Sequence, residues 1–392
     1  MAPASSFVAL ALVLGSGMSA SALHTLPVRK IVKEGVVNSD RARMAELAKK
    51  AHSKRGSAVP VTNSGITYLA SVGIGSPPTQ YTLQVDTGSA NIWVGFNKTY
   101  VKTNTSINTG DDLSLSYGDG TVYGFEYLDE VTLAPGLVIA NQSVGVSNNT
   151  GNFAINAAVD GIMGIGLTSQ TTGSVTSPDG SIPANATVPT VTDNLYAQGK
   201  IDAKVVGIQF APSSGDSEGS LTFGEADTSK YLGSITYTPS NTGSWYISQN
   251  ITYGNTTILS GSGIVDTGTI MVYMSINEFE GYLQNSGGSY NTTENLISFT
   301  PAQYAALKPL NFIIGGGKFT LSANAQIWPR KLNSLIGGEE GEIYSIVSTF
   351  GNELPFNFIL GYSFLERFYS VFDTTNSRIG FAPTKFTNAT TN

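Results

Sequence analysis

The chain has 392 residues, of which 44 are glycine and only 12% are charged, and this composition favours short strands and turns over long helices. The length is sufficient for two hydrophobic cores. Cysteine is absent, which excludes disulfides and thiolate catalysis and leaves the cellular compartment undecided. The formal net charge is −7, divided unevenly along the sequence. We therefore expect an all-β protein.

The first 22 residues resemble a secretory signal. An apolar run from Phe7 to Leu14 is followed by small residues up to Ala22, although no basic residue precedes the run. No later segment has the roughly 20 apolar residues that a membrane-spanning helix needs, and the polar end at 384–392 does not resemble a lipid-anchor signal. The sequence predicts a secreted, extracellular protein without a membrane anchor, with a vacuolar destination as the alternative.

Nine Asn-x-Ser/Thr sequons support export, although a Thr-rich chain also acquires such sequons by composition alone. They begin at Asn97, Asn104, Asn141, Asn148, Asn185, Asn250, Asn255, Asn291 and Asn388.

A basic segment follows the signal, at residues 23–57. It holds nine lysines and arginines against three acids, a net charge of +6, whereas the rest of the chain carries −13. A basic stretch ahead of an acidic body is typical of a pro-segment held by electrostatic attraction. Residues 41–50 also have a helical composition. The alternative is a disordered basic tail that binds nucleic acid or a membrane.

Both histidines of the chain, His24 and His52, lie in this basic segment. The body therefore has neither histidine nor cysteine, which excludes Ser-His-Asp catalysis, Cys-His catalysis and ordinary zinc sites there. Carboxylates remain for acid–base chemistry. We expect no metal and no cofactor.

From Tyr68 onward, short apolar runs alternate with turn residues, as expected for strands. Residues 114–125 alternate into a Gly-Asp-Gly turn and predict a hairpin. Short helices are predicted where a cap or a first-turn proline precedes a suitable run, at 190–198, 277–285 and 300–307.

An internal repeat gives the clearest sign of organisation. Residues 83–89, Leu-Gln-Val-Asp-Thr-Gly-Ser, recur at 263–269 as Gly-Ile-Val-Asp-Thr-Gly-Thr, 180 residues further along the chain. An apolar run that ends in glycine follows each copy, at 161–164 and 358–361. The repeat predicts two related β lobes.

The lobes are expected at 58–235 and 236–392, with their junction between Phe223 and Pro239. Each would then contain one Asp-Thr-Gly turn, with Asp86 in the first lobe and Asp266 in the second.

The repeated Asp-Thr-Gly predicts a pair of acids. A strand that ends in this tripeptide places its carboxylate on a tight turn, because glycine allows close backbone approach and threonine can bond a neighbouring backbone group. Two carboxyls in contact cannot both ionise, so they share one proton. One can then activate a water as base while its protonated partner polarises a carbonyl.

These features resemble those of the pepsin-like aspartic proteases, and the body is similar to the members that fungi secrete. The resemblance covers Tyr68 to Phe386 and rests on residues 85–94, 117–120, 160–164, 264–269, 359–361, 372–373 and 380–383. It implies a bilobal fold of two β-barrel-like lobes with a cleft between them. It also implies hydrolysis of internal peptide bonds at acidic pH by a monomer, with peptide and protein substrates and pepstatin-type inhibitors as partners and no nucleic acid.

By this resemblance, Asp86 and Asp266 are the catalytic pair. Hydroxyls from Ser89 and Thr269 would support their outer oxygens, and the two motif threonines would lock the turns together. The supporting residues, three in each copy of the motif, are Thr87, Gly88, Ser89, Thr267, Gly268 and Thr269.

The predicted hairpin corresponds to the flap over the family's cleft. Tyr117 would close over substrate and bond Trp93, with Gly118 and Asp119 at the tip. An acid at the tip is associated in fungal relatives with accepting lysine in the first substrate pocket. Alternatively, Trp93 only packs in the core, and Asp119 is an ordinary turn residue.

The basic segment would inhibit the enzyme through a lysine placed between the two carboxylates, and Lys49, Lys50 and Lys54 are the candidates. Lys54-Arg55 is a possible processing site, so the mature chain should begin between Gly56 and Thr62.

Two departures from the better-known members are the missing disulfides and Tyr362, which stands where an acid is frequent.

A non-catalytic pepsin homologue that binds or inhibits a partner is the first rival interpretation, but both motifs and Tyr117 are intact. A glycoside hydrolase is the second, although its chemistry does not call for two symmetric turns and a flap.

Overall fold

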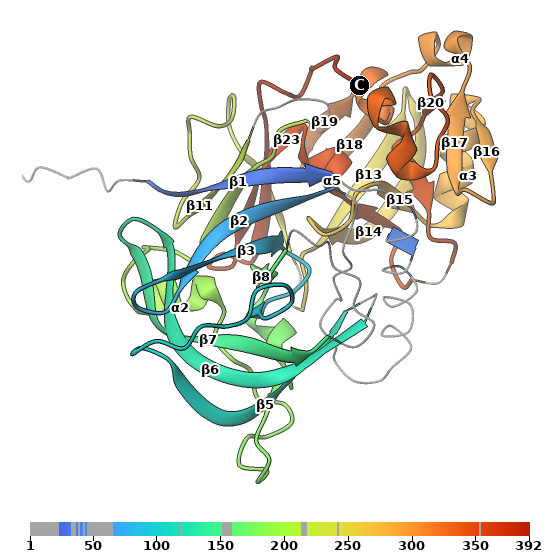
Figure 1. The fold of residues 1–392 in the computed structure, drawn as a ribbon. Coiled ribbons are helices and arrows are strands. Elements are labelled where there is room, and N and C mark those ends of the chain that lie inside the picture. Colours follow the sequence, from blue (N-terminus) through green and yellow to red (C-terminus); the bar gives the residue numbers. More distant parts are fainter. Residues whose placement is uncertain are drawn as a thin grey trace, which may run out of the picture.

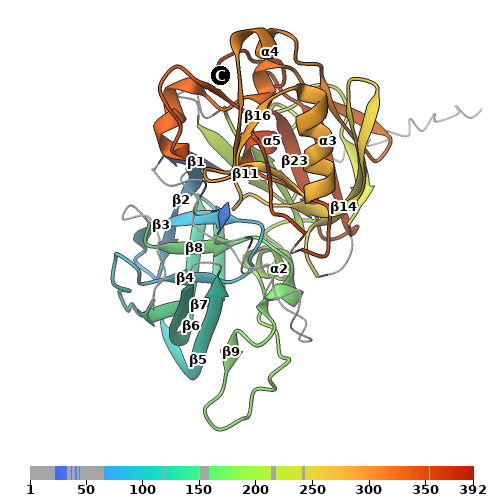
Figure 2. The same cartoon turned by 90° about the vertical axis from the view of Figure 1, so that its right-hand side faces the viewer.

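The computed structural model describes the fold of most of the chain. Described are residues 23–32, 37, 40, 41, 44, 66–117, 120–150, 159–212, 218–240, 243–352 and 354–392. The fold is mostly β, as predicted, with a few short helices, and it forms two lobes (Figure 1). Strands β5 to β7 belong to one lobe, whereas β13 to β19 and helices α3 and α4 belong to the other (Figures 1 and 2).

A 14-stranded sheet supplies the first lobe and continues between the lobes, in the order β12-β24-β23-β10-β11-β1-β2-β3-β8-β4-β7-β6-β5-β9. Its strands are β1 (His24–Val32), β2 (Ile66–Ile74), β3 (Thr79–Asp86), β4 (Ile92–Val94), β5 (Ile107–Tyr117), β6 (Gly120–Ala134), β7 (Leu137–Asn149), β8 (Gly161–Gly164), β9 (Val175–Thr176), β10 (Val205–Gln209), β11 (Gly219–Phe223), β12 (Thr236–Pro239), β23 (Phe368–Asp373) and β24 (Arg378–Pro383).

The second lobe is built on a seven-stranded sheet, in the order β19-β18-β13-β14-β22-β15-β21. Its strands are β13 (Tyr246–Tyr253), β14 (Thr256–Val265), β15 (Val272–Met274), β18 (Leu310–Ile314), β19 (Gly317–Leu321), β21 (Val347–Thr349) and β22 (Phe358–Leu360). A small sheet of three strands lies beside it, made of β16 (Ser289–Asn291), β17 (Leu296–Phe299) and β20 (Ile343–Tyr344).

The helices of the described residues are short. The α-helices are α2 (Val191–Ala197), α3 (Ile276–Ser286), α4 (Pro301–Ala305) and α5 (Tyr362–Leu365), and the 3-10 helices are η1 (Thr168–Thr171), η2 (Asn324–Gln326) and η3 (Arg330–Ile336). Three of the α-helices lie where they were predicted. Within the described residues, no helix is both long enough and apolar enough to cross a bilayer.

Two of these helices begin at threonine caps. Thr190 accepts from the backbone of Asp193 at 3.1 Å and Thr300 accepts from Gln303 at 3.3 Å, and both caps are reciprocated. Helix α4 ends at Ala305, before the predicted 307, because its last turn tightens: the Ala306 N–H donates to the Gln303 carbonyl at 3.0 Å and the Leu307 N–H to the Tyr304 carbonyl at 3.2 Å.

The sheets place the two motif copies in equivalent settings. Strand β3 ends at Asp86 and pairs in parallel with β8, and β14 ends one residue before Asp266 and pairs in parallel with β22. Both β8 and β22 are completely buried, as expected for short apolar strands in the middle of a sheet. The two apolar runs that follow the motifs are therefore the neighbours of the motif strands.

Candidate active site

Asp86 lies on the tight turn that follows β3. Its side chain is fully buried, and its Oδ1 accepts a hydrogen bond of 3.0 Å from the backbone N–H of Gly88. The Ser89 hydroxyl donates to Oδ2. Both oxygens of this carboxyl are thus held by donors from the next three residues, which fixes the orientation of the group.

Asp266 has the same environment in the second lobe. Its exposed fraction is 1%, and Oδ1 accepts from the Gly268 N–H at 3.0 Å. The Thr269 hydroxyl donates to Oδ2 at 2.5 Å. The hydroxyls of Ser89 and Thr269 therefore have equivalent roles, as the resemblance implied for their positions.

The two turns are joined by their threonines. The backbone N–H of Thr87 donates to Oγ1 of Thr267 at 3.0 Å, and the Thr267 N–H donates to Oγ1 of Thr87, also at 3.0 Å. The structure thus brings together all six predicted supporting residues and places the two aspartates on adjacent turns. Their catalytic role stays a prediction.

The backbone of each turn is hydrogen-bonded to the apolar run that ends in glycine or to the residue directly after it. The Ile165 N–H donates to the carbonyl of Asp86 at 2.8 Å, and the Asp266 N–H donates to the carbonyl of Leu360 at 3.0 Å. A Cβ at Gly164 would lie 2.6 Å from the Ala90 backbone, and one at Gly361 would lie 2.2 Å from the Met271 carbonyl oxygen. Glycine is required at both positions because the backbones approach so closely.

The flap hairpin consists of β5 and β6, which pair up to Tyr117 and Gly120. The indole N–H of Trp93 donates to the Tyr117 hydroxyl at 2.7 Å, and both side chains are buried. Trp93 therefore packs in the core and also orients the flap tyrosine. Gly118 and Asp119 lie outside the described residues.

Sequence reasoning missed Asp40, which comes from the basic segment. Its fully buried carboxylate accepts from the backbone N–H groups of Ile270, at 3.3 Å, and Met271, also at 3.3 Å. Both donors lie immediately after the Asp266 turn. The only available signal was an acid within a basic stretch, which does not identify a partner. Lys49, Lys50 and Lys54 fall outside the described residues.

Tyr273 lies near this contact. Burial raises the pKa of its hydroxyl well above the usual range, and the neighbouring Asp40 carboxylate raises that pKa further. Tyr273 therefore stays neutral across the pH range in which carboxylates titrate.

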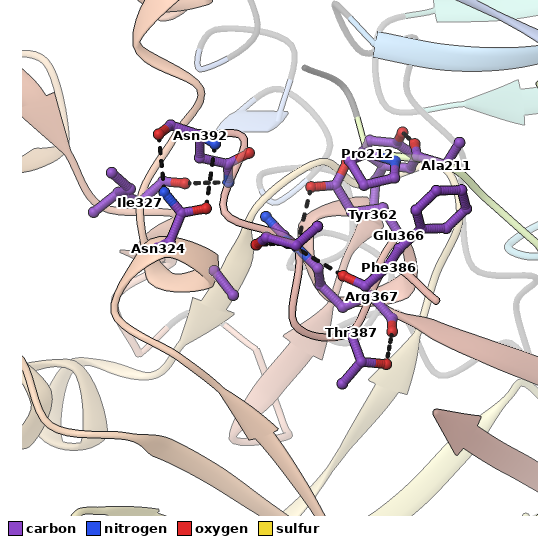
Figure 3. A network of polar contacts seen from close by, with 12 residues as sticks. Ala211, Pro212, Asn324, Ile327, Tyr362, Glu366, Arg367, Phe386, Thr387 and Asn392 are labelled. Atoms are coloured by element: carbon purple, nitrogen blue, oxygen red, sulfur yellow. Dashed lines mark hydrogen bonds and ion pairs between the residues drawn. The ribbon is translucent and has the colours of Figure 1, made fainter. Parts of the chain in front are cut away.

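Tyr362, the departure noted in the sequence, follows Gly361 and is fully buried. Its backbone N–H donates to the Thr269 carbonyl at 2.7 Å, and its hydroxyl donates to the Ala211 carbonyl at 2.7 Å and lies 2.9 Å from the Tyr68 hydroxyl. Burial raises the pKa of Tyr362 well above its usual range, so the hydroxyl remains a donor. Tyr362 connects the second motif to the sheet between the lobes, in the network drawn in Figure 3.

This arrangement can carry out acid–base chemistry with carboxyl groups alone. Two buried carboxyls on joined turns, each held by two donors, are suited to sharing a proton and polarising a water. Within the described part of the chain, no group of three or more His, Cys, Asp or Glu side chains is arranged to hold a metal ion.

The comparisons with known proteins agree with this geometry. The family model described as eukaryotic aspartyl protease matches residues 67–384. Polyporopepsin of Irpex lacteus is 47% identical over 345 residues, which cover 85% of this chain and 99% of that protein. Cathepsin E of Rattus norvegicus is 28% identical and covers 98% of this chain and 99% of its own length.

A solved structure also matches. The crystal structure of the aspartic proteinase from Irpex lacteus superposes with a TM-score of 0.77 at 42% identity, over 95% of this chain and all of that one. The predicted fold class is confirmed by this likeness. The chain belongs to the pepsin-like family of eukaryotic aspartic endopeptidases.

Proposed function

We propose that this chain is the precursor of a secreted endopeptidase that hydrolyses internal peptide bonds in acid, with Asp86 and Asp266 as its catalytic pair. The observation that carries the proposal is the reciprocal bonding of Thr87 and Thr267, which joins two equivalently supported carboxyls. One carboxylate takes a proton from a water held between them. The protonated partner donates to the oxygen of the scissile carbonyl as the water attacks its carbon.

The enzyme would be active in acid because the pair must hold one proton. One carboxyl must be ionised to act as base, and the other must be protonated to act as acid. The flap contributes by covering the substrate, since exclusion of water strengthens the electrostatic interactions in the site. Tyr117 is oriented for this role by Trp93. Peptide and protein substrates and pepstatin-type inhibitors would bind between the flap and the two turns, in a monomeric enzyme.

Two features support export and precursor status. All nine sequon asparagines are exposed, as glycan acceptors must be. Strand β1 and Asp40, both from the basic segment, contact the body. We infer a signal at 1–22, a pro-segment at 23–57 and lobes at 58–235 and 236–392. Secretion is preferred to a vacuolar destination.

The decisive experiment is hydrolysis of casein or denatured haemoglobin at about pH 3 to 5, after the basic segment has been removed. The wild-type protein should cleave both substrates and be blocked by pepstatin. Asp86→Asn should lose at least about 1,000-fold in kcat/KM with an unchanged melting temperature, because the exchange removes the titrating group. Activity that survives this exchange would exclude the mechanism and favour the alternative of a non-catalytic pepsin homologue.

A narrower proposal concerns lysine acceptance by Asp119. Asp119→Ser should depress cleavage after lysine by about 10-fold and spare cleavage after phenylalanine or leucine, because only the cationic side chain loses a charge partner. Paired peptides that differ only at the residue before the cleaved bond provide the measurement. Equal losses on both peptides would make Asp119 an ordinary turn residue.

A further inference from the structure

We propose that Asp40 is the acid-sensitive anchor of the basic segment: its ionised carboxylate occupies two backbone donors beside the Asp266 turn and is released when acid protonates it. The inference rests on the proposed function, since it assigns a regulatory residue to that site. It differs from the expected lysine contact because the titrating group lies on the segment itself and backbone amides of the body are among its partners.

The contact is specific in its geometry. The Ile270 N–H is shared between Oδ1, at 3.3 Å, and Oδ2, at 3.4 Å, and the Met271 N–H reaches Oδ2 at 3.3 Å. These residues follow Thr269, whose hydroxyl holds Oδ2 of Asp266. Asp40 therefore bonds the stretch of backbone that begins directly after the second catalytic motif.

Three other described residues of the segment, Val37, Arg41 and Met44, also contact the body of the protein. Val37, Asp40, Arg41 and Met44 are helical, and their spacing puts them on one face of a helix. Val37 and Met44 are buried in the hydrophobic core, with exposed fractions of 5% and 4%. Arg41 donates to the carbonyl of Thr293 at 3.0 Å. Apolar contacts thus flank Asp40 on both sides and keep water from its carboxylate.

The titratable groups around Asp40 come from three elements. Tyr273 of β15 interacts electrostatically with Asp40 and with Arg41, the neighbour of Asp40 in the segment. Tyr290 of β16 interacts with Arg41 and with Tyr273. Burial raises the pKa of both tyrosine hydroxyls, so Tyr273 and Tyr290 stay neutral between pH 3 and 7. Among these groups, Asp40 alone changes charge in the range in which the enzyme would become active.

The direction of the pH effect follows from the donors. An ionised carboxylate accepts from both amides, whereas the protonated group carries a hydrogen of its own and forms weaker bonds. The contact is present while Asp40 is ionised and is lost as the pH falls through its titration. Acid would thus loosen the segment in the same range that gives the catalytic pair its shared proton.

Hydrogen exchange on the full chain tests this contact without relying on catalysis. The chain carries Asp86→Asn to prevent self-cleavage, and exchange of the amides of Ile270 and Met271 is followed by mass spectrometry from pH 6.5 to 3. With Asp40 present, the protection factor should fall at least 10-fold as the pH is lowered. Asp40→Asn should be at least 10-fold less protected at pH 6.5 and nearly independent of pH.

Two further variants control for folding and for overall charge. Asp40→Ser retains an acceptor that does not titrate, so its protection should be insensitive to pH even where Asp40→Asn disturbs the helix. Glu46→Gln makes the same charge change in the same segment and should behave as the unaltered chain does. Protection in Asp40→Asn equal to that with aspartate, or an equal effect of Glu46→Gln, would overturn the proposal.

A second readout uses the precursor with Asp86 intact. At pH 5, Asp40→Asn should convert to the mature form at least 10-fold faster than wild type, and unchanged conversion would contradict the proposal. If no form of the protein cleaves casein even after the segment is removed, the proposed function fails. The exchange experiment still decides the role of Asp40 in that case.

Discussion

Thr87 and Thr267 bond to each other twice, each through its backbone N–H to the other's hydroxyl oxygen, at 3.0 Å in both directions. They are 180 residues apart in the sequence and come from different lobes. Both are buried, so neither amide has water as a substitute partner. The relative position of the two carboxyls therefore depends directly on this pair.

Removal of the Thr87 hydroxyl should show how much its hydrogen bond to the Thr267 N–H contributes beyond packing. Thr87→Ala leaves the Thr267 N–H buried without its acceptor, and we expect a loss of about 1 to 3 kcal/mol in the free energy of unfolding. Urea denaturation measures the loss, and kcat/KM should fall with it. Thr87→Ser keeps the oxygen and is the matched control. If alanine and serine behave alike, the hydroxyl bond is not what joins the turns.

The bond between Trp93 and Tyr117 should be measurable as a coupling energy. Trp93→Phe, Tyr117→Phe and the double variant form a cycle in kcat/KM, and the two residues should be coupled by about 0.5 to 1.5 kcal/mol. Each single change removes the 2.7 Å hydrogen bond while keeping an aromatic ring. Additive effects would mean that Trp93 contributes to the flap only by packing.

The motifs and their supporting residues could be predicted because they are local and repeated. Asp86 and Asp266 come with their own donors within three residues, and the two copies share one pattern. The helix after Thr190 was likewise predictable, since its cap lies in the adjacent sequence. In these cases, neighbouring residues determine the structure.

Glu126 should make stability depend on pH. It is buried with an exposed fraction of 6%, and burial raises the pKa of its carboxyl despite the hydrogen bond from Ser143. The folded state therefore binds the proton more tightly than the unfolded state does. The stability that this proton binding contributes is fully present below the pKa that Glu126 has in the unfolded chain. It is lost as the pH rises through the pKa of Glu126 in the folded protein.

Glu126→Gln should therefore stabilise the protein at pH 7, by about 1 kcal/mol, and change little at pH 4. The amide oxygen can still accept from Ser143. Urea midpoints at the two pH values give the measurement, and Glu130→Gln on the same strand is the control. A gain of equal size at both pH values would contradict the assignment.

Arg367 and Glu366 form a buried pair. The exposed fractions of these residues are 0% and 2%, and Arg367 Nε lies 3.7 Å from Glu366 Oε1. Arg367 Nη1 also donates to the Ala389 carbonyl at 2.8 Å. Burial lowers the pKa of the guanidinium.

Arg367→Met should destabilise the protein by about 3 to 5 kcal/mol, because it removes the cation beside the buried carboxyl of Glu366 and the donor to the Ala389 carbonyl. Adding Glu366→Gln should recover part of the loss, which thermal unfolding would detect. If the double variant is less stable than Arg367→Met alone, the cost arises from the lost bonds to backbone carbonyls and not from the loss of the cation beside Glu366.

What the sequence could not predict depends on residues far apart in the chain. Asp40 meets Ile270 across 230 positions, and nothing in either neighbourhood indicates the other. Tyr362 was noticed only as an unusual residue, because its bond to the Ala211 carbonyl depends on how the sheet between the lobes is built. Strands β23 and β24 join the same sheet as β10 for a similar reason, since sheet register is set by tertiary packing.

Strand β1 would add a step to the proteolytic maturation proposed above. It pairs with β11 through residues 24–28 and with β2 through residues 28–32. Cutting the chain after Arg55 would break none of these pairings. Cleavage alone would therefore leave a complex of two fragments that stay paired through β1. We expect its parts to migrate together on a sizing column and to separate on a denaturing gel. The lifetime of this complex would then be set by how fast β1 separates from β11 and β2, and not by the rate of cleavage.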